Sequence, residues 1–186
     1  MMIHQKRRPS VLSASWFYTP LGEMTAIADE QALYLLEFTD CRFIEHEINR
    51  LREKMLCTIV PSETKPLQSI QGELDPYFEG TLSDFKTPLR LLGSPFQLSV
   101  WEALTQIPYG ETRSYANVAA FLGKPTAYRA VAQANGNNQF AIVVPCHRVI
   151  NNNGGLGGYG RGLSRKEWLI NHEKKCKTEV KAITDD

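Results

Sequence analysis

The first half of the chain alternates short apolar runs with polar turn signals. Strand-like stretches broken by turns at PLG and DE fill Ser13–Phe38, which predicts two or three antiparallel strands. Apolar residues then recur at helical spacing from Arg42 to Met55 and again from Lys65 to Glu79, with CTIV as a short strand between them. The pattern therefore predicts an α/β unit over residues 1–92.

The pattern becomes mainly helical after Gly93. Ser94 can cap a helix, and Gln97 can complete its capping box. Ser114 can cap a second, short helix, YANVAAFLG, and the segment TAYRAVAQANG predicts a third helix with Gly136 as its C-cap. Two short helices joined by a tight, glycine-containing turn are the outline of a helix-turn-helix.

The end of the chain combines a buried-looking run, a glycine-rich loop and a last helix. The apolar run FAIVVP, Phe140–Pro145, predicts a strand, and NNNGGLGGYGRG predicts a loop. A second capping box from Ser164 to Glu167 predicts the start of a helix that ends at Glu173, followed by a charged tail that is expected to fray. The expected domains are therefore 1–92 and 93–175, with a tail over 176–186.

Composition limits the class of protein. With 186 residues, of which 42% are apolar and 22% charged, the chain suits one large or two small globular domains. No apolar run reaches about 18 residues, and the basic N-terminus lacks a following apolar stretch, so neither a membrane span nor a secretory signal is expected. The four cysteines form no CxxC pair, which argues against a disulfide scaffold or a zinc finger and favours a reducing cytoplasm.

Charge is unevenly distributed along the chain. Residues 1–92 contain ten basic and thirteen acidic side chains, whereas residues 93–175 contain nine basic and four acidic ones. The second half therefore carries the positive field. Such a field is compatible with binding to nucleic acid and equally with an ordinary basic surface.

Cys146, in AIVVPCHRVI, is the first candidate for chemistry. Pro145 ends the predicted strand, so the thiol lies where an element meets a loop, a position that favours reactive groups. His147 and Arg148 follow directly, and positive neighbours favour the thiolate. A buried structural thiol is the alternative. Adjacency in the sequence does not place the imidazole on the sulfur, so a separate base or carboxylate partner is expected.

Arg129 is a second candidate, because it lies within an otherwise small and apolar helix. It is either a solvated charge or, if this helix is the second of a helix-turn-helix, a residue that faces DNA. Ala130 and the neighbouring alanines would let the helix approach a groove closely. Asn135, Asn137 and Asn138 are consistent with cap and turn residues.

Together these motifs resemble the O6-alkylguanine-DNA alkyltransferases. The similarity is continuous from Gly93 to Glu173, through SPFQLSVWEALTQIPYGETRSYANVA, PCHRVI and GGYGRGLSRKEWLINHE. The first half is similar more loosely, through TPLGEMTAIADEQALYLLEF and DPYFEG. The resemblance implies an α+β protein of two domains, an N-terminal α/β domain of the ribonuclease-H type and a C-terminal winged helix-turn-helix domain.

The resemblance also implies the chemistry of a repair protein that acts once. Cys146 would attack the alkyl carbon on O6 of guanine, with O4 of thymine left open, and form a stable thioether. His147 would take the thiol proton through a bound water, and Glu173 would orient His147. Tyr115 would protonate the leaving guanine, and Asn137 would brace the turn around the active site.

The same family implies how the lesion is reached. The nucleotide would be flipped out of the duplex, and Arg129 would enter the vacated space from a helix in the minor groove, with Ala130 beside it. Gly160 stands where many members have serine, and Arg161 stands at the pocket rim, where some relatives have glycine or a bulky aromatic residue. The base pocket implied by the family comprises Pro145, Val149, Tyr159 and Gly160.

The partner implied by the resemblance is double-stranded DNA containing O6-alkylguanine, with no role for a membrane. We expect a monomer in the cytoplasm, associated with the nucleoid, and leave open whether copies bind cooperatively along DNA. No cofactor is expected. Some relatives hold a structural zinc, but Cys41, Cys57, His4 and His46 lack the spacing for it, so no metal is expected.

Three alternatives stay open at this point. The first is a damage-binding protein of the alkyltransferase-like type, in which the acceptor cysteine is replaced, whereas this chain keeps Cys146. The second is a Cys-His hydrolase, which would turn over repeatedly and would not need Arg129. The third is a winged-helix transcription regulator, whose binding to DNA would not depend on the thiol.

Overall fold

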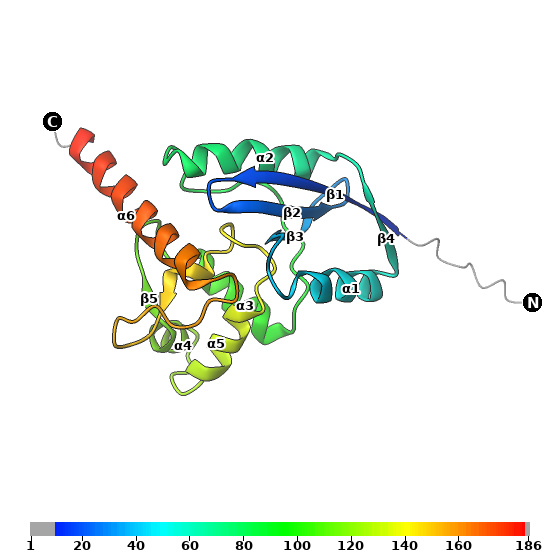
Figure 1. The fold of residues 1–186 in the computed structure, drawn as a ribbon. Coiled ribbons are helices and arrows are strands. Elements are labelled where there is room, and N and C mark those ends of the chain that lie inside the picture. The colour runs from blue at the N-terminus through cyan, green and yellow to red at the C-terminus, as the bar shows by residue number, and fades with distance from the viewer. Residues whose placement is uncertain (1–9, 185–186) are drawn as a thin grey trace, which may run out of the picture.

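The structure is a computed structural model in which the backbone of residues 10–184 is described. Its first part consists of β1 (Ser10–Thr19), β2 (Gly22–Ala28), β3 (Leu33–Phe38), α1 (Ile44–Met55), β4 (Cys57–Pro61) and α2 (Lys65–Phe78). The strands form one sheet in the order β3-β2-β1-β4 (Figure 1). β2 pairs antiparallel with β1 and with β3, and β4 pairs parallel with β1. The strands and helices predicted for this half are confirmed.

The two faces of this sheet pack against different helices. Met24 and Ala26 of β2 belong to the main core cluster, to which α2 contributes Leu67. Ile27, which points to the opposite face, joins a smaller cluster with Leu51 of α1. Successive side chains of a strand alternate between faces, so the sheet is covered on both sides, by α2 on one and α1 on the other (Figure 1).

The second part of the chain is mainly helical, as predicted. Its elements are α3 (Pro95–Thr105), β5 (Arg113–Ser114), α4 (Tyr115–Phe121), α5 (Tyr128–Gly136), η1 (Cys146–Arg148), β6 (Val149–Ile150) and α6 (Leu163–Thr184). α4 and α5 are the two short helices of the predicted helix-turn-helix, and β5 pairs parallel with β6 beside them. The long helix α6 projects away from the rest of this part (Figure 1).

Side-chain caps set the starts of two of these helices. The hydroxyl of Ser94 accepts a hydrogen bond from the backbone N–H of Gln97, whose side chain accepts one from the N–H of Ser94. Ser114 and Asn117 make the same reciprocal pair at the start of α4. Both serines were predicted as caps, and both predictions are confirmed because the capping groups satisfy N–H donors that a helix leaves without partners.

The strand predicted at FAIVVP is wrong. Phe140 makes only an isolated bridge to Leu36 of β3. The chain then turns sharply, with hydrogen bonds from Val143 N–H to the Ala141 carbonyl and from Val144 N–H to the Phe140 carbonyl. These residues are nearly all buried, and a buried turn has the same continuous apolar pattern as a buried strand.

Three predictions about helix ends are also wrong. α5 ends at Gly136 with Asn137 as its C-cap at φ −90°, so no left-handed glycine caps it. α6 begins at Leu163, directly after Gly162 at φ +99°, so Ser164 lies inside the first turn instead of capping it. α6 also continues past Glu173 to Thr184, into the tail that was expected to fray.

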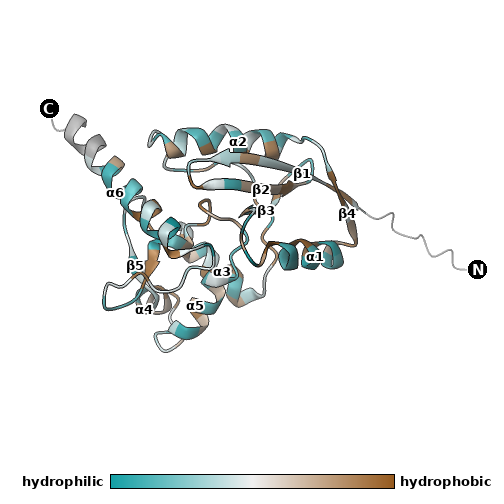
Figure 2. Ribbon diagram, in the orientation of Figure 1, coloured by the Kyte–Doolittle hydropathy of each residue, from teal (hydrophilic) through white to brown (hydrophobic). Residues whose placement is uncertain are grey.

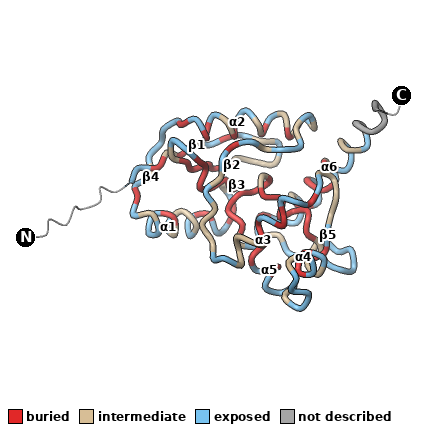
Figure 3. The backbone as a smooth tube through the Cα atoms, turned by 180° about the vertical axis from the view of Figure 1, so that it is seen from behind, coloured by how far each residue is buried: buried red, intermediate tan, exposed pale blue. Residues whose placement is uncertain are grey.

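One core joins the two parts of the chain. The main cluster extends from the strands and α2 to Trp101 and Leu104 of α3 and to Phe140 in the buried turn. The indole N–H of Trp101 donates to the carbonyl of Ala134, 2.8 Å away, and so fixes α3 against α5. Buried backbone continues from the sheet into the second part of the chain (Figure 3). The outer faces of α1 and α2 are hydrophilic (Figure 2).

Among the described residues, no helix combines the length and the apolar character needed to cross a membrane.

Candidate active site

Cys146 begins η1 and is completely buried. Two asparagine side chains hold the turn that leads to it. The Asn138 amide donates to the carbonyls of Phe140 (3.1 Å) and Val144 (2.9 Å), and its oxygen accepts from the N–H of Phe140 (2.9 Å). The Asn135 amide donates to the carbonyl of Cys146 itself, 3.3 Å away. These bonds satisfy buried backbone groups that a strand would otherwise have paired.

The bracing asparagine is therefore not the one that the resemblance indicated. Asn137 is the C-cap of α5, and its side chain makes no hydrogen bond within the described part of the chain. The structure assigns the brace to Asn138, with Asn135 as a second support. The sequence alone does not distinguish Asn135, Asn137 and Asn138, because which of them braces the turn depends on where the chain folds back.

A buried carboxylate network lies on one side of the thiol. Glu173 Oε1 is 2.7 Å from Nε2 of His147, 2.8 Å from the hydroxyl of Tyr77 and 3.1 Å from Nη2 of Arg148. Its other oxygen, Oε2, accepts from Nε of Arg148 (2.8 Å) and from the N–H of Gly110 (3.2 Å). The structure thus confirms contact between His147 and Glu173, and it adds Tyr77 and Arg148 as further donors to the same carboxylate.

This network fixes the protonation of the imidazole. Burial opposes ionisation of Glu173, but His147 and Arg148 outweigh burial and hold the pKa of Glu173 well below its ordinary value. An ionised carboxylate only accepts hydrogen bonds, so Nε2 of His147 carries a proton and Nδ1 is the basic atom. Nδ1 is buried without a hydrogen-bond partner among the described residues. Burial, partly offset by Glu173, lowers the pKa of His147, so the ring is neutral near pH 7.

A second buried ion pair lies against the sulfur. Nη1 of Arg161 is 3.3 Å from Sγ of Cys146. Its Nε and Nη2 bind the two carboxylate oxygens of Glu37 at 2.8 and 2.6 Å, and Nη2 also donates to the carbonyl of Asn138. Arg148, the positive neighbour expected to favour the thiolate, instead binds Glu173. The guanidinium at the sulfur thus comes from a residue that the sequence placed only at the pocket rim.

Lys166 is a buried cation beside the site that the sequence did not reveal. Its ammonium group is buried and donates to the carbonyls of Val149 (2.6 Å), Leu156 (2.5 Å) and Gly158 (3.4 Å). It therefore holds the glycine-rich loop against β6 and α6. Burial lowers the pKa of Lys166 to about 8. The sequence signal that could have indicated burial of Lys166 is its spacing, three residues before Leu169, which places both on the same face of α6.

A cavity of about 520 Å³ opens between α5 and the glycine-rich loop. Four of the residues predicted for the site line it, namely Tyr115, Arg129, Tyr159 and Gly160, and Arg161 lines it as well. The hydroxyl of Tyr159 is buried without a partner among the described residues. Burial and then Cys146 raise the pKa of Tyr115 and, more strongly, that of Tyr159, so both hydroxyls keep their protons near pH 7.

The other predicted residues lie behind or beside this cavity. Pro145 and Val149 are buried and are not among the residues that line it. Ala130 is exposed on α5 next to Arg129. Because Arg161 both lines the cavity and touches Sγ, Cys146 lies directly behind that part of the wall.

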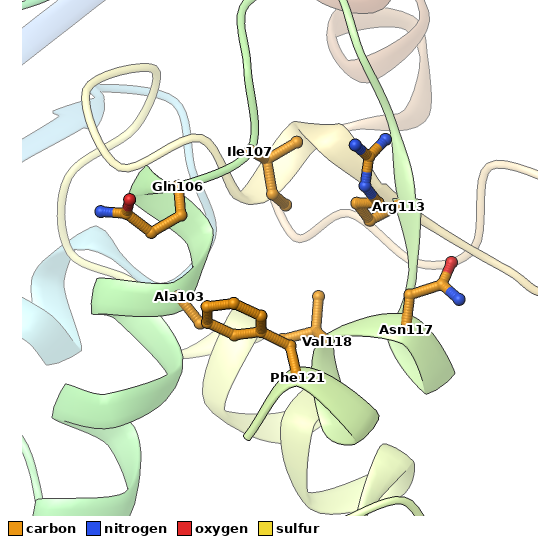
Figure 4. A pocket seen from close by; sticks show the side chains of 7 residues that line it. All are labelled: Ala103, Gln106, Ile107, Arg113, Asn117, Val118 and Phe121. Atoms are coloured by element: carbon orange, nitrogen blue, oxygen red, sulfur yellow. The ribbon is translucent and has the colours of Figure 1, made fainter. Parts of the chain in front are cut away.

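A second hollow, of about 500 Å³, lies between α3, α4 and β5 (Figure 4). Its lining includes Ala103, Val118, Arg113 and the exposed ring of Phe121, and none of the predicted site residues. The chemistry of the chain is therefore gathered at the cavity beside Cys146 and not here.

The described residues contain no group of three or more His, Cys, Asp or Glu side chains that could hold a metal ion. Of the residues considered for zinc, Cys41 and Cys57 are buried free thiols, and His4 lies outside the described residues.

Comparison with known proteins shows relatives of both parts. Models of 6-O-methylguanine DNA methyltransferase match twice, the ribonuclease-like domain over residues 14–91 and the DNA-binding domain over residues 95–175. A methylated-DNA–protein-cysteine methyltransferase of Methanosarcina barkeri is 52% identical over 84% of this chain and 93% of its own length. The constitutive methylated-DNA–protein-cysteine methyltransferase of Bacillus subtilis is 40% identical over 84% of this chain and 92% of its own.

Solved structures agree with these relatives. O6-methylguanine methyltransferase of Mycobacterium tuberculosis is 38% identical, with a TM-score of 0.75 over 88% of this chain and 93% of that one. A structure of the M. tuberculosis protein OGT in complex with DNA is similar to the same degree, over 90% of this chain and 94% of that one.

Proposed function

This chain belongs to the 6-O-methylguanine DNA methyltransferase family, and we propose that Cys146 is the residue to which it transfers the alkyl group. The chain is a DNA-repair enzyme that binds DNA and moves an alkyl group from it to a cysteine of its own. The observation that carries the choice of Cys146 is its place directly behind the cavity wall, where Arg161 of that wall touches its sulfur.

The transfer begins with removal of the thiol proton. His147 takes that proton at Nδ1 through a bound water, while Nε2 stays bonded to Glu173. The thiolate then attacks the alkyl carbon, so that a sulfur–carbon bond forms as the bond from that carbon to O6 breaks. The electron pair of the broken bond stays on the guanine, and the hydroxyl of Tyr115 donates a proton to the base. The thioether product is stable, so one protein repairs one lesion.

Reaching O6 requires the nucleotide to leave the duplex. We propose that the base enters the cavity, where Tyr159, Gly160, Val149 and Pro145 form or support its binding site. Arg129, exposed on α5 at the same cavity, fills the space that the flipped nucleotide leaves in the base stack. The small side chain of Ala130 lets the helix come close to the minor groove. The positive charge of residues 93–175 supports contact with phosphates.

The domain division, the oligomeric state, the location and the substrate are also part of the proposal. We propose a division of the chain near Gly93 and a protein that acts as a monomer on nucleoid DNA in the cytoplasm. The substrate is duplex DNA with O6-alkylguanine. Cys146 distinguishes the chain from the alkyltransferase-like proteins, in which that residue is replaced, and the Glu173 network supports chemistry that a plain transcription regulator does not need.

The proposal is tested by separating binding from transfer. Cys146→Ser should bind a duplex containing O6-methylguanine with unchanged affinity and should take up no alkyl group, because a hydroxyl is far less nucleophilic than a thiolate near neutral pH. Cys176→Ser, on α6, is the matched control and should transfer normally. Transfer that survives Cys146→Ser would assign the acceptor to another residue.

A further inference from the structure

The contact between Arg161 and the Cys146 sulfur is not used by the mechanism described so far. Arg161 is buried, with 6% of its surface exposed, although it carries a permanent positive charge. In the described part of the chain it is the arginine that both lines the cavity and touches Sγ, with Nη1 3.3 Å from the sulfur. A buried charge at the reacting atom is costly unless it is paired, so its position requires an explanation.

We propose that Arg161 is a second catalytic residue, whose guanidinium stabilises the Cys146 thiolate before attack, and that Glu37 of the N-terminal part positions it. The proposal rests on Cys146 being the acceptor. It gives the first part of the chain a direct role in the chemistry, since Glu37 lies on β3 and is 124 residues from Arg161 in sequence.

The geometry of the guanidinium supports this role. Glu37 binds Nε and Nη2 with its two oxygens, at 2.8 and 2.6 Å, and the carbonyl of Asn138 accepts from Nη2. These three bonds fix the plane of the group and leave Nη1 directed at the sulfur. A guanidinium held in this way loses little further conformational entropy when it binds the charged sulfur, whereas a lysine on its flexible side chain would lose more.

The charges around Arg161 keep it a cation. Burial works against its charge, but Glu37 and then Cys146 outweigh burial and raise the pKa of Arg161. Glu37 supplies the counter-charge while the thiol is still protonated. When the proton leaves, the sulfur becomes a second anion at hydrogen-bond distance from the guanidinium, which donates a charge-assisted hydrogen bond to it.

Other charged groups at the site have different partners. Lys166 is a second cation near the sulfur, but its ammonium group is bound by the carbonyl of Val149 in β6 and by two carbonyls of the glycine-rich loop. Arg148 is bound to Glu173 and to the carbonyl of Ile107. Cys41 faces the Glu37–Arg161 pair from the segment after β3, and its thiol donates to the carbonyl of Gly160. The titratable groups that interact with Cys146 from neighbouring elements are Tyr115, Tyr159, Lys166 and Arg161, and His147 follows it in η1.

The step balances without a proton from Arg161. The thiol proton goes to His147, and the sulfur electron pair forms the new bond to the alkyl carbon. The pair from the broken bond to O6 goes to the guanine. Arg161 stabilises the charge on sulfur and loses that interaction when the neutral thioether forms, while its ion pair with Glu37 remains.

The test is the rate of a single round of transfer from a duplex containing O6-methylguanine, measured from about pH 6 to about pH 9.5. Arg161→Met should lower the rate at pH 7 roughly 10- to 100-fold, and the loss should shrink as pH rises, because the thiolate then forms without help. Arg161→Lys keeps a charge and should recover part of the rate. An equal loss at every pH, or a lysine variant no better than methionine, would overturn the catalytic role.

A double variant tests the part assigned to Glu37. Glu37→Gln alone should slow transfer, because an amide cannot accept both bonds from the guanidinium. Combined with Arg161→Met it should cause no further loss of rate, since Glu37 acts through Arg161. The double variant also removes both buried charges together, so it keeps the test valid if Arg161→Met alone fails to fold. An additive loss in the double variant would contradict the positioning role.

A matched control removes a different contact between the same two parts of the chain. Arg165 of α6 binds Asp40 at 2.8 Å and the carbonyl of Arg161 at 3.0 Å, so it contacts the backbone of Arg161 and not its guanidinium. Asp40→Asn should therefore leave the rate and its pH profile unchanged, and a shift in that profile would indicate a merely structural effect. If the unaltered protein itself takes up no alkyl group, the proposed function fails. If it transfers but Arg161→Met retains the unaltered profile, only the role of Arg161 fails.

Discussion

Two buried arginine–carboxylate pairs flank Cys146, and they differ in which partner faces the chemistry. In the pair Arg148–Glu173, the carboxylate is the member that contacts His147, the proposed base, and Arg148 binds the carboxylate from the other side. In the pair Arg161–Glu37, the guanidinium touches the sulfur and the carboxylate supports it. The first pair lies wholly in the second half of the chain, and the other joins the two halves.

The comparison shows that adjacency along the chain does not assign a role. Arg148 is two residues after Cys146 but is directed toward Glu173, because the tight turn of η1 sends successive side chains in different directions. Arg161 is fifteen residues away and makes the contact that Arg148 was expected to make. Each pair therefore predicts a different response to loss of its carboxylate.

The largest effect is expected at Glu173. In Glu173→Gln, the amide cannot accept all of the hydrogen bonds that the carboxylate accepts from its donors. The change also removes the negative charge that neutralises buried Arg148. The free energy of unfolding should fall by about 3–5 kcal/mol, measured by urea denaturation, and transfer should fall with it. Glu167→Gln, at an exposed position on the same helix, should change stability by less than about 0.5 kcal/mol. Equal effects at the two positions would contradict the network.

Acid should remove the same contribution in the unaltered protein. The folded-state pKa of Glu173 is depressed, so its stabilisation is present above the unfolded value of about 4.3 and is lost as pH falls below it toward the folded pKa. The difference in stability between the unaltered protein and Glu173→Gln should therefore narrow below about pH 4.3. A difference that is the same at pH 7 and in acid would show that the charge of Glu173 does not supply the stabilisation.

A smaller effect should distinguish the two asparagines near the turn. Asn138→Ala leaves the buried N–H of Phe140 without its partner and removes one of the two hydrogen bonds that each of the Phe140 and Val144 carbonyls accepts, so it should cost about 1–3 kcal/mol. Asn137→Ala removes a side chain without hydrogen bonds and should cost less than about 0.5 kcal/mol. Thermal unfolding of the two variants side by side decides between them, and a larger loss at Asn137 would restore the assignment that the sequence indicated.

The smallest effect is expected at a residue that belongs to neither pair. Tyr115→Phe removes the proposed proton donor without changing a charge at the sulfur. Transfer should slow about tenfold, with the affinity for DNA and the shape of the pH profile unchanged. An unchanged rate would remove Tyr115 from the mechanism, and a shifted profile would show that it also influences the thiol.

Much of this fold follows from local signals in the sequence. The serine caps at Ser94 and Ser114 mark helix starts because their hydroxyls bind backbone donors a few residues ahead. The run MTAIA of β2, buried throughout, is typical of a strand in a sheet with both faces covered. The run after Asn138 could not be assigned, since its turn depends on side-chain amides and on a left-handed Ile142, at φ +71°, that no periodicity predicts.

The site was predictable to the same extent. Cys146, His147 and Glu173 are indicated by motifs with near-constant spacing. Glu37 had no such signal, because it stands among apolar residues of β3 and its partner Arg161 is distant in sequence. Lys166 was also not predicted, because its ammonium group binds three carbonyls that converge only when the glycine-rich loop folds back.

The most direct test of the account is the intact mass of the protein after incubation with a duplex that carries one O6-methylguanine. We predict a gain of about 14 Da, the mass of one methylene, that stops at one per protein and maps to Cys146. A gain on Cys41, Cys57 or Cys176, repeated turnover without a mass change, or DNA binding with no gain at all would contradict it.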